Sequence, residues 1–420
     1  MVNRFHFDLH RIGGFLPLRS CSFIQSNSKI ATCTWTRTYM RTNNDETKLK
    51  LQKQSKSLLV ENIVEDMSEA DFSSISSALN SKGYTRASSS SKQLLSPSTC
   101  EILKQTTIPN LFRGNFDTNI YPDEWHWREG ISRDEAAREM CNTWKSSYKI
   151  ASIVLNEKLG EFVARVMGWD SIRIAQDDIV WKPPQKKGQH HQHNQQIYSS
   201  SLDNKRIDTV GFHQDSAYIS TQFNPYENNS VALWMALDDA DEENGCLEYA
   251  VGSHLWKPIL RLQKGQDALV DESVGAGVTS FHESDESSYR NGLLNAARTA
   301  DVDFDDQNPY SIIERVPVNM GHAVLHHQDV WHGSGPNTSH TRHRRALVAH
   351  YLRGDVEFVG DGEKSDKGRF RPPFGKTSYI YGRYKRYQSL EVDETFFPII
   401  YGSQGGLKRT EWLDQFLSVA

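Results

Sequence analysis

GFHQD at residues 211–215 and WHGSGPN at residues 331–337 are the two motifs around which the rest of the sequence can be placed. Side chains alternate between the faces of a β-strand, so His213 and Asp215 are expected to point to the same side. His332 lies 119 residues after His213 (332 minus 213) and can approach them from a second strand. Two imidazoles and one carboxylate form a ligand set that suits Fe(II) and leaves coordination positions open. The sequence therefore predicts that His213, Asp215 and His332 bind a metal and form a catalytic centre.

Short apolar stretches with turn residues between them surround both motifs. They predict strands over residues 172–182, 208–215, 231–237, 246–251, 313–318, 323–327, 329–334 and 345–352. Many short strands at this spacing favour a β-sandwich or barrel. We therefore expect a fold that is mainly β.

Helical patterns come before the strands. We expect helices from a capping box at Ser68 to Gly83, from Ser96 and Pro97 onward, from Ser132 through Ala136, Met140 and Trp144, and over about residues 150–168. Their apolar stripes are typical of helices that pack against a sheet. We expect these N-terminal helices to buttress one face of a barrel.

Composition excludes several classes of protein. The 420 residues carry a net charge of −5, with 37% hydrophobic and 24% charged residues, and show no basic patch with interleaved aromatics, so nucleic-acid binding is not expected. No apolar run approaches the ~18–20 residues needed to cross a bilayer. The five cysteines show no C-x-x-C spacing, which favours a reducing compartment over a disulfide framework.

Four segments carry a resemblance to a known family. They are DDIVWKPP (177–184), GFHQD (211–215), ALWMALDDADEENGCLEYAVGSHLW (232–256) and HGSGPN (332–337) with the arginines that follow. In these segments, and in their order, the chain resembles the phytanoyl-CoA dioxygenase family of Fe(II)- and 2-oxoglutarate-dependent oxygenases. The resemblance implies a double-stranded β-helix, the jelly-roll barrel of cupins. It also implies an enzyme that uses Fe(II), 2-oxoglutarate and O₂ to hydroxylate a small-molecule substrate, releasing succinate and CO₂.

The resemblance also implies how the cosubstrate is held. Its far carboxylate needs a cation on a barrel strand, preferably a bidentate arginine, and Ser334 would donate its hydroxyl to the same group. Arg344 matches the family's position if the loop at 338–343 contains one extra residue. Arg345 remains an alternative, because alternation allows only one of the two to face inward.

Three further residues are expected near the cosubstrate. Lys182 matches a Lys-Pro-Pro motif of the family, and Trp234 matches a tryptophan that lines the barrel. Gln176 lies an even number of residues from Lys182 and is expected to face the same pocket. For each of the three, a purely structural role is an alternative.

Other readings of the metal-binding motif remain open. His326 and His327 are rival distal ligands, but they precede the Gly-Ser-Gly turn that follows the family's ligand. A cupin-type metalloenzyme that does not use 2-oxoglutarate is one alternative function, although it has no need of Arg344 with Ser334. A non-catalytic binding module is the other, although none of the expected ligands is missing.

The ends of the chain differ in composition from its middle. Residues 1–44 carry six basic side chains and one acidic one among many serines and threonines, which predicts either an organelle transit peptide or a disordered tail. Mitochondrion is the first expectation, with plastid or cytoplasm as alternatives. Residues 45–92 read as a linker with one possible helix, and residues 93–405 as the dioxygenase domain.

Two segments lie beyond the predicted barrel strands. Residues 257–312 form a long insertion, and its part from 264 to 311 holds ten acidic residues against three basic ones. Insertions of this length often act as lids, so we expect it to cover the substrate. The tyrosine-rich stretch before residue 405 and the tail at 406–420 are expected to pack back on the barrel.

Overall fold

The computed structural model describes residues 67–87, 93–185, 207–256, 281–284, 290–303, 305, 308, 310–360 and 379–419. The predicted transit peptide at residues 1–44 lies outside the described residues, as does much of the 257–312 insertion. No helix in the described part of the chain is long and apolar enough to cross a membrane.

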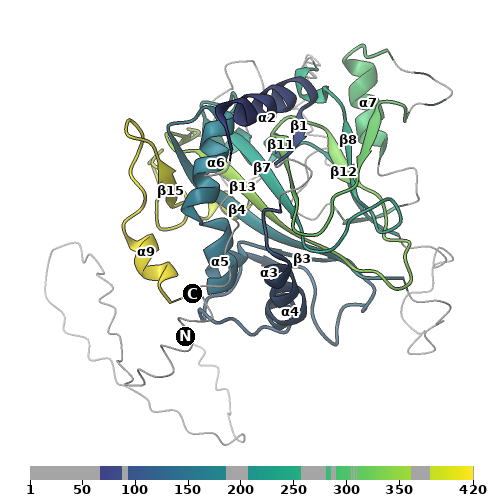
Figure 1. The fold of residues 1–420 in the computed structure, drawn as a ribbon, viewed down its shortest axis with the longest axis horizontal. Coiled ribbons are helices and arrows are strands. Elements are labelled where there is room, and N and C mark those ends of the chain that lie inside the picture. Colours follow the sequence, from purple (N-terminus) through teal and green to yellow (C-terminus); the bar gives the residue numbers. More distant parts are fainter. Residues whose placement is uncertain are drawn as a thin grey trace, which may run out of the picture. The chain divides into compact units, whose positions relative to one another are not determined.

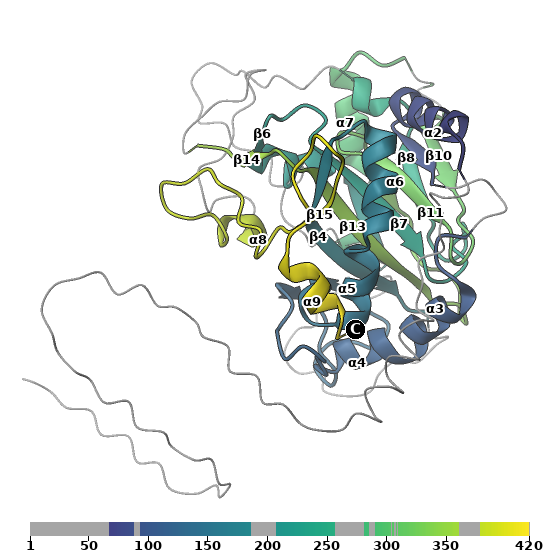
Figure 2. The same ribbon diagram turned by 60° about the vertical axis from the view of Figure 1, so that its left-hand side comes forward.

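Two antiparallel sheets form the centre of the fold (Figures 1 and 2). The larger one runs in the order β1 (Tyr84–Arg86), β11 (Ala323–His327), β7 (Ser230–Ala236), β13 (Arg344–Arg353), β4 (Ser171–Lys182), β3 (Arg138–Cys141) and β2 (Glu124–Trp125), and β15 (Ile399–Gly402) also pairs with β4. The smaller one runs β10 (Ile313–Val316), β8 (Leu247–Ala250), β12 (His332–Ser334), β5 (Ile207–His213) and β9 (Phe281–Ser284). A separate two-stranded sheet joins β6 (Phe223–Asn224) and β14 (Glu357–Phe358).

The predicted mainly β fold with flanking helices is confirmed, and each of the eight predicted strands is present with small shifts at its ends. Within the described residues, however, the strands form two separate sheets and not a closed barrel. A jelly roll can be built as two facing sheets, so this arrangement keeps the predicted topology class.

Strand β7 shows how the sequence pattern divides the core. Leu233 and Met235 lie in a cluster with residues of the helices, whereas Ala232 and Trp234 lie in a second cluster with residues of β8, β10 and β11. This alternation places one set of side chains against the helices and the other between the two sheets. The functional side chains described below belong to the space between the sheets.

The helices that cover the large sheet are α2 (Glu69–Lys82), α3 (Pro97–Ile102), a π-helical turn η1 (Leu103–Thr107), α4 (Ile108–Phe112), α5 (Tyr148–Val154) and α6 (Glu157–Met167). Figure 2 shows α6 lying along β13 and β15. The predicted caps are confirmed: Ser68 and Asp71 form a capping box, and the Ser96 side chain accepts from the backbone of Thr99. The helix predicted at 150–168 is divided in two, because Asn156 caps α6.

The helix predicted from Ser132 is wrong. The chain instead forms strand β3 over Arg138–Cys141 and a 3-10 turn, η2, over Thr143–Lys145. The spacing of Met140 and Trp144 suits a helix, but Met140 belongs to a strand whose neighbours point to the other face. The Asp177 carboxylate then accepts the backbone N–H of Trp144 and the hydroxyl of Thr143, which fixes the turn.

The described part of the 257–312 insertion adds β9 to the edge of the smaller sheet and packs helix α7 (Asn291–Thr299) against it. Helix α7 buries Leu293 and Ala296 against Phe212 and Trp331. On their strands, Phe212 and Trp331 are the neighbours of His213 and His332, so they point away from the space between the sheets. The predicted lid function of the insertion therefore stays a prediction.

The end of the chain packs on the large sheet, as expected. Strand β15 pairs with β4, and α9 (Trp412–Leu417) places Trp412 against Trp144. In α8 (Tyr379–Gly382), Tyr381 is fully buried and donates its hydroxyl to the side chain of Gln176. The segment after β13 thus contributes to the interior of the domain.

Candidate active site

Two neighbouring strands and a turn bring the three predicted metal ligands together. His213 ends β5, and its cross-strand partner is His332, the first residue of β12. Asp215 follows in the short turn η3 (Asp215–Ala217). One ligand-type atom from each of these three side chains lies within 4.8 Å of the others.

Both imidazoles are oriented by backbone carbonyls. Nδ1 of His213 donates to the carbonyl of Gly211 at 2.8 Å, and Nδ1 of His332 donates to that of Val330 at 3.0 Å. We assign the protons to Nδ1 because a carbonyl can only accept. Each Nε2 then carries a lone pair that can bind a metal ion. Nε2 of His213 lies 3.5 Å from Oδ1 of Asp215, and Nε2 of His332 lies 3.6 Å from the same oxygen. Such second-sphere hydrogen bonds are typical of histidines that ligate metals.

Asp215 is buried and has several further partners. Tyr218 donates its hydroxyl to Oδ1 at 2.8 Å, and Nε2 of His326 lies 3.0 Å from Oδ2. Burial acts to raise the pKa of Asp215, but the nearby His332 and His350 hold it well below its usual range. Burial also lowers the pKa of His332 well below its usual value. An ionised carboxylate and a neutral imidazole are the forms that bind a metal ion.

His326, the rival distal ligand, contacts the Asp215 carboxylate and does not join the group of converging ligand atoms. Its Nδ1 accepts from the hydroxyl of Tyr249 at 3.0 Å while its Nε2 faces Asp215. Both ring nitrogens are therefore engaged within the protein. His326 orients the carboxylate, and the ligand atoms that converge belong to His213, Asp215 and His332.

A chain of buried polar groups extends from Asp215 to the middle of β4. His350 lies with Nδ1 3.4 Å from Oδ2 of Asp215 and with Nε2 3.1 Å from Asp178. Burial acts to lower the pKa of His350, but Asp215 and Asp178 raise it to about 10. Asp178 also accepts from Gln176 at 2.8 Å, and Gln176 accepts from Tyr381 at 2.8 Å.

The predicted cosubstrate residues Arg344, Ser334 and Lys182 form a second group. Arg344 is 1% exposed, and its Nη2 donates to the hydroxyl of Ser334 at 2.8 Å while its Nε donates to the carbonyl of Gly245 at 3.0 Å. Lys182, the cross-strand partner of Arg344, donates to the same hydroxyl at 2.7 Å and to the carbonyl of Gly335 at 2.6 Å. Ser334 therefore accepts two hydrogen bonds and keeps its own proton for a ligand.

The neighbouring Arg345 faces the opposite side of β13. Its guanidinium pairs with both oxygens of Asp238, at 2.7 and 2.9 Å, and donates to the carbonyl of Lys104 in η1. The structure thus places Arg344 between the sheets and Arg345 against the helices. No carboxylate forms an ion pair with Arg344 within the described residues, which is unusual for a fully buried cation.

Trp234 and Gln176, the remaining two predicted residues, lie in different parts of the space between the sheets. Trp234 lies between the sheets, with its ring centroid 5.6 Å from the Arg344 guanidinium carbon. Gln176 also faces inward, but it stands six residues from Lys182 on β4, roughly 20 Å along the strand. The structure therefore groups Gln176 with Asp178, apart from Arg344. The cosubstrate-binding roles of Lys182, Trp234 and Gln176 stay predictions.

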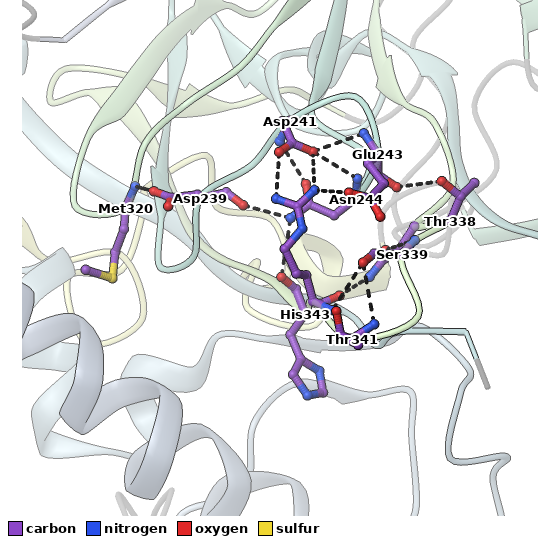
Figure 3. Close-up of polar contacts among 11 residues, drawn as sticks. Asp239, Asp241, Glu243, Asn244, Met320, Thr338, Ser339, Thr341 and His343 are labelled. Carbon is purple, nitrogen blue, oxygen red and sulfur yellow. Dashed lines mark hydrogen bonds and ion pairs between the residues drawn. The ribbon is translucent and has the colours of Figure 1, made fainter. Parts of the chain in front are cut away.

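The loop before Arg344 is held by a clasp of polar contacts (Figure 3), which we call the Asp241 clasp. Arg342 pairs with both oxygens of Asp241, at 2.6 and 2.8 Å, and Asp241 also accepts the backbone N–H groups of Glu243 and Asn244. Asn337 closes the other end by donating to the carbonyl of Arg342 at 2.8 Å. The predicted one-residue insertion at 338–343 would fall in this loop and stays a prediction.

Sequence reasoning did not assign a role to three side chains of this network: the half-buried Tyr218 and the buried His350 and Tyr381. One signal was present for His350, because it lies six residues from Arg344 on the same strand and so shares its face. The other contacts join distant parts of the chain. The sequence pattern contains no local signal for them.

The fold and site together define a two-sheet β protein with a His-Asp-His metal centre and a buried arginine nearby. The model of the phytanoyl-CoA dioxygenase family (PhyH) matches residues 92–346, which is more than half of the chain. The chain therefore belongs to the phytanoyl-CoA dioxygenase family.

Individual relatives are more distant. Over 130 residues the chain is 32% identical to phytanoyl-CoA dioxygenase domain-containing protein 1 of Danio rerio, which covers 30% of this chain and 34% of that protein. Among solved structures, the carbocyclase SnoK of nogalamycin biosynthesis aligns with a TM-score of 0.48 and 18% identity, over 80% of this chain and 97% of that one. The epimerase SnoN, in complex with Fe³⁺, alpha ketoglutarate and nogalamycin RO, aligns with a TM-score of 0.44 and 13% identity, over 79% and 100%.

The residues fit the cofactors that the family implies. His213, Asp215 and His332 offer two imidazole nitrogens and one carboxylate oxygen, a donor set that suits non-haem Fe(II). Arg344 is a buried cation without a protein carboxylate among the described residues, and it lies beside a hydroxyl that can donate. Iron and 2-oxoglutarate are therefore the cofactors of this site.

Proposed function

We propose that the protein is an Fe(II)- and 2-oxoglutarate-dependent dioxygenase that hydroxylates a small-molecule substrate, releasing succinate and CO₂. The observation that carries this proposal is the placement of two groups on one strand. His332 begins β12, and Ser334, which contacts Arg344, ends it. Two residues of a strand span roughly 7 Å, a distance comparable with the length of a five-carbon dicarboxylate.

The side chains of this site have separable roles in the proposal. His213, Asp215 and His332 hold the iron, and the carbonyl hydrogen bonds at each Nδ1 keep the rings in place. Arg344 and Ser334 bind the far carboxylate of 2-oxoglutarate. When bound, iron with 2-oxoglutarate and O₂ supplies the oxidising chemistry that hydroxylates a C–H bond.

Lys182 positions this carboxylate site. Its ammonium group donates to the hydroxyl of Ser334 and to the carbonyl of Gly335, so it holds the turn that follows His332. The combination of Arg344 and Ser334 also favours an oxygenase over a cupin-type enzyme that does not use 2-oxoglutarate. Such an enzyme has no need for a buried dicarboxylate site.

The proposal is tested by spectroscopy on the full chain. Purified protein is incubated without oxygen with Fe(II) and 2-oxoglutarate, and the weak visible metal-to-ligand charge-transfer band is recorded. We expect the band in the wild type and its loss in Asp215→Ala. The variant Asp414→Ala, which removes an exposed carboxylate of α9, is the matched control and should keep the band.

Two other results would contradict the proposal. Iron binding without the band would argue against chelation by 2-oxoglutarate and favour a cupin-type metalloenzyme. A protein that binds no iron would favour a non-catalytic module. If the band is present, release of succinate in the presence of candidate small molecules then identifies the substrate.

We also propose that residues 1–44 direct the protein to mitochondria. Support comes from six basic residues against one acidic residue in this segment. The segment is fused to a fluorescent protein, and colocalisation with a mitochondrial marker is expected. Fluorescence in plastids or throughout the cytoplasm would contradict the proposal.

A further inference from the structure

A second group of possible metal ligands lies between strands β3 and β4. Glu139 and Cys141 are two residues apart on β3, and Asp178 is the cross-strand partner of Cys141. One ligand-type atom from each of the three side chains lies within 4.8 Å of the others, and all three side chains are buried. This group, which we call the β3–β4 cluster, was not expected from the sequence because residues 138–141 were predicted to be helical.

Glu139 provides an independent sign that the cluster takes a ligand. The residue is 7% exposed, and its Oε2 has no hydrogen-bond partner among the residues that the structure describes. A buried carboxyl oxygen without a partner is costly, by about 1–3 kcal/mol. Because the carboxylate of Glu139 is directed at Cys141 and Asp178, a bound cation at that point would satisfy it.

Burial raises the pKa of the Glu139 carboxyl and of the Cys141 thiol well above their usual values. Asp178 accepts from Gln176 and lies 3.1 Å from Nε2 of His350. The cluster is therefore joined by hydrogen bonds and close contacts to Gln176 and His350 on its inner side.

We propose that Glu139, Cys141 and Asp178 form a second metal site that binds a borderline divalent cation such as Zn²⁺. Two ligands of one zinc ion are separated by up to about 4.6 Å, because each bond is ~2.0–2.3 Å long. The three donor atoms lie within 4.8 Å of one another, so small side-chain shifts would bring them to this span. A thiolate among the donors selects zinc-like ions over Mg²⁺ or Ca²⁺, which prefer oxygen ligands only.

A metal ion binds cysteine as the thiolate, so uptake of a cation at Cys141 releases the thiol proton to solvent.

The second site lies one side chain away from the first. His350 contacts Asp178 of the β3–β4 cluster and Asp215 of the His-Asp-His centre. An ion in the cluster would also tie β3 to β4, next to the position at which Tyr381 contacts Gln176. The proposal does not depend on the oxygenase activity, because it concerns a different set of donors.

The test uses Co²⁺, because only a cysteine ligand gives a thiolate-to-cobalt charge-transfer band in the near ultraviolet. Metal-free full-length protein is titrated with Co²⁺, and the release of protons is followed in weakly buffered solution. We expect the band in the wild type, saturating at one equivalent at this site, and its loss in Cys141→Ser. Cys246→Ser is the matched control, because Cys246 is also buried between the sheets, and it should keep the band.

Two further variants separate this proposal from the first one. Asp215→Ala removes a ligand of the His-Asp-His centre, which contains no sulfur, and should keep the thiolate band. Glu139→Gln keeps the shape of the side chain, so it should fold, and we expect at least tenfold weaker Co²⁺ binding at the thiolate site. A wild type without the band, or a band that persists in Cys141→Ser, would overturn the second metal site.

Discussion

The two faces of strand β13 carry similar side chains in very different surroundings. Arg344 lies between the sheets, contacts a hydroxyl and a carbonyl, and forms no ion pair within the described residues. Arg345, its neighbour, faces the helices and forms a bidentate pair with Asp238. The inner arginine is arranged for an anion that arrives from outside, and the outer one is arranged for the fold. Side-chain alternation along one strand separates these two purposes.

The largest expected effect concerns these two arginines. Arg344→Met should raise the KM for 2-oxoglutarate by about 100-fold, because losing one partner of a buried charged pair costs about 2–5 kcal/mol. Arg345→Met should leave this KM unchanged and lower the free energy of unfolding by about 1–3 kcal/mol instead. Steady-state kinetics with succinate as the readout, together with urea unfolding, would measure both. A larger effect of Arg345→Met on the KM would contradict the assignment of Arg344 to 2-oxoglutarate binding.

A second prediction tests the outer face alone. Leu347 is fully buried in the cluster between the large sheet and the helices. Leu347→Ala should lower the free energy of unfolding by about 2–5 kcal/mol, because it leaves a cavity. The KM for 2-oxoglutarate in the folded variant should not change. A several-fold change in KM would show that the two faces are coupled.

A third prediction concerns the hydroxyl of Ser334 beside Arg344 on the inner face. Ser334→Ala removes a hydroxyl that accepts from Arg344 and Lys182. The KM for 2-oxoglutarate should rise about fivefold, corresponding to ~1 kcal/mol for one hydrogen bond. Ser339→Ala is the matched control in the nearby loop and should change the KM little. Equal effects of the two substitutions would argue against a direct contact of Ser334 with the cosubstrate.

A fourth prediction is a dependence of stability on pH. Asp215 and Asp178 raise the pKa of His350 from 6.5 to about 10 in the folded protein, against the effect of burial. Stability from this histidine is therefore complete below pH 6.5 and is lost as the pH rises through about 10. In metal-free protein, the difference in unfolding free energy between wild type and His350→Gln should shrink over that range. A difference that grows with pH would contradict the charge assigned to His350.

The sequence alone was sufficient to predict features that depend on residues close to one another in the chain. His213 and Asp215 could be placed on one side because they lie two residues apart at the end of a strand, and the glycine-rich motif identified His332. Helix caps at Ser68 and Ser96 could also be predicted, since they depend on residues only three positions away. The predicted strands followed from their apolar alternation in the same way.

The sequence alone could not predict the contacts that depend on the register between distant strands. Choosing between Arg344 and Arg345 requires the pairing of β13 with β4, in which Arg344 is opposite Lys182. The contact of Tyr381 with Gln176 joins residues 205 positions apart. At residues 138–141 an apolar spacing that suited a helix was overridden, because pairing with β4 buries Glu139 and Cys141 on one face and Met140 on the other.

The Asp241 clasp has a consequence for how this chain can vary in length. Because Asn337 and Arg342 are each anchored, residues between them can be added without displacing Arg344. Loop closure costs only about 0.6 kcal/mol for each doubling of length, so short insertions there are inexpensive. Homologous chains can therefore differ in the spacing between the distal histidine and the arginine, and an alignment by residue count alone would assign the wrong arginine.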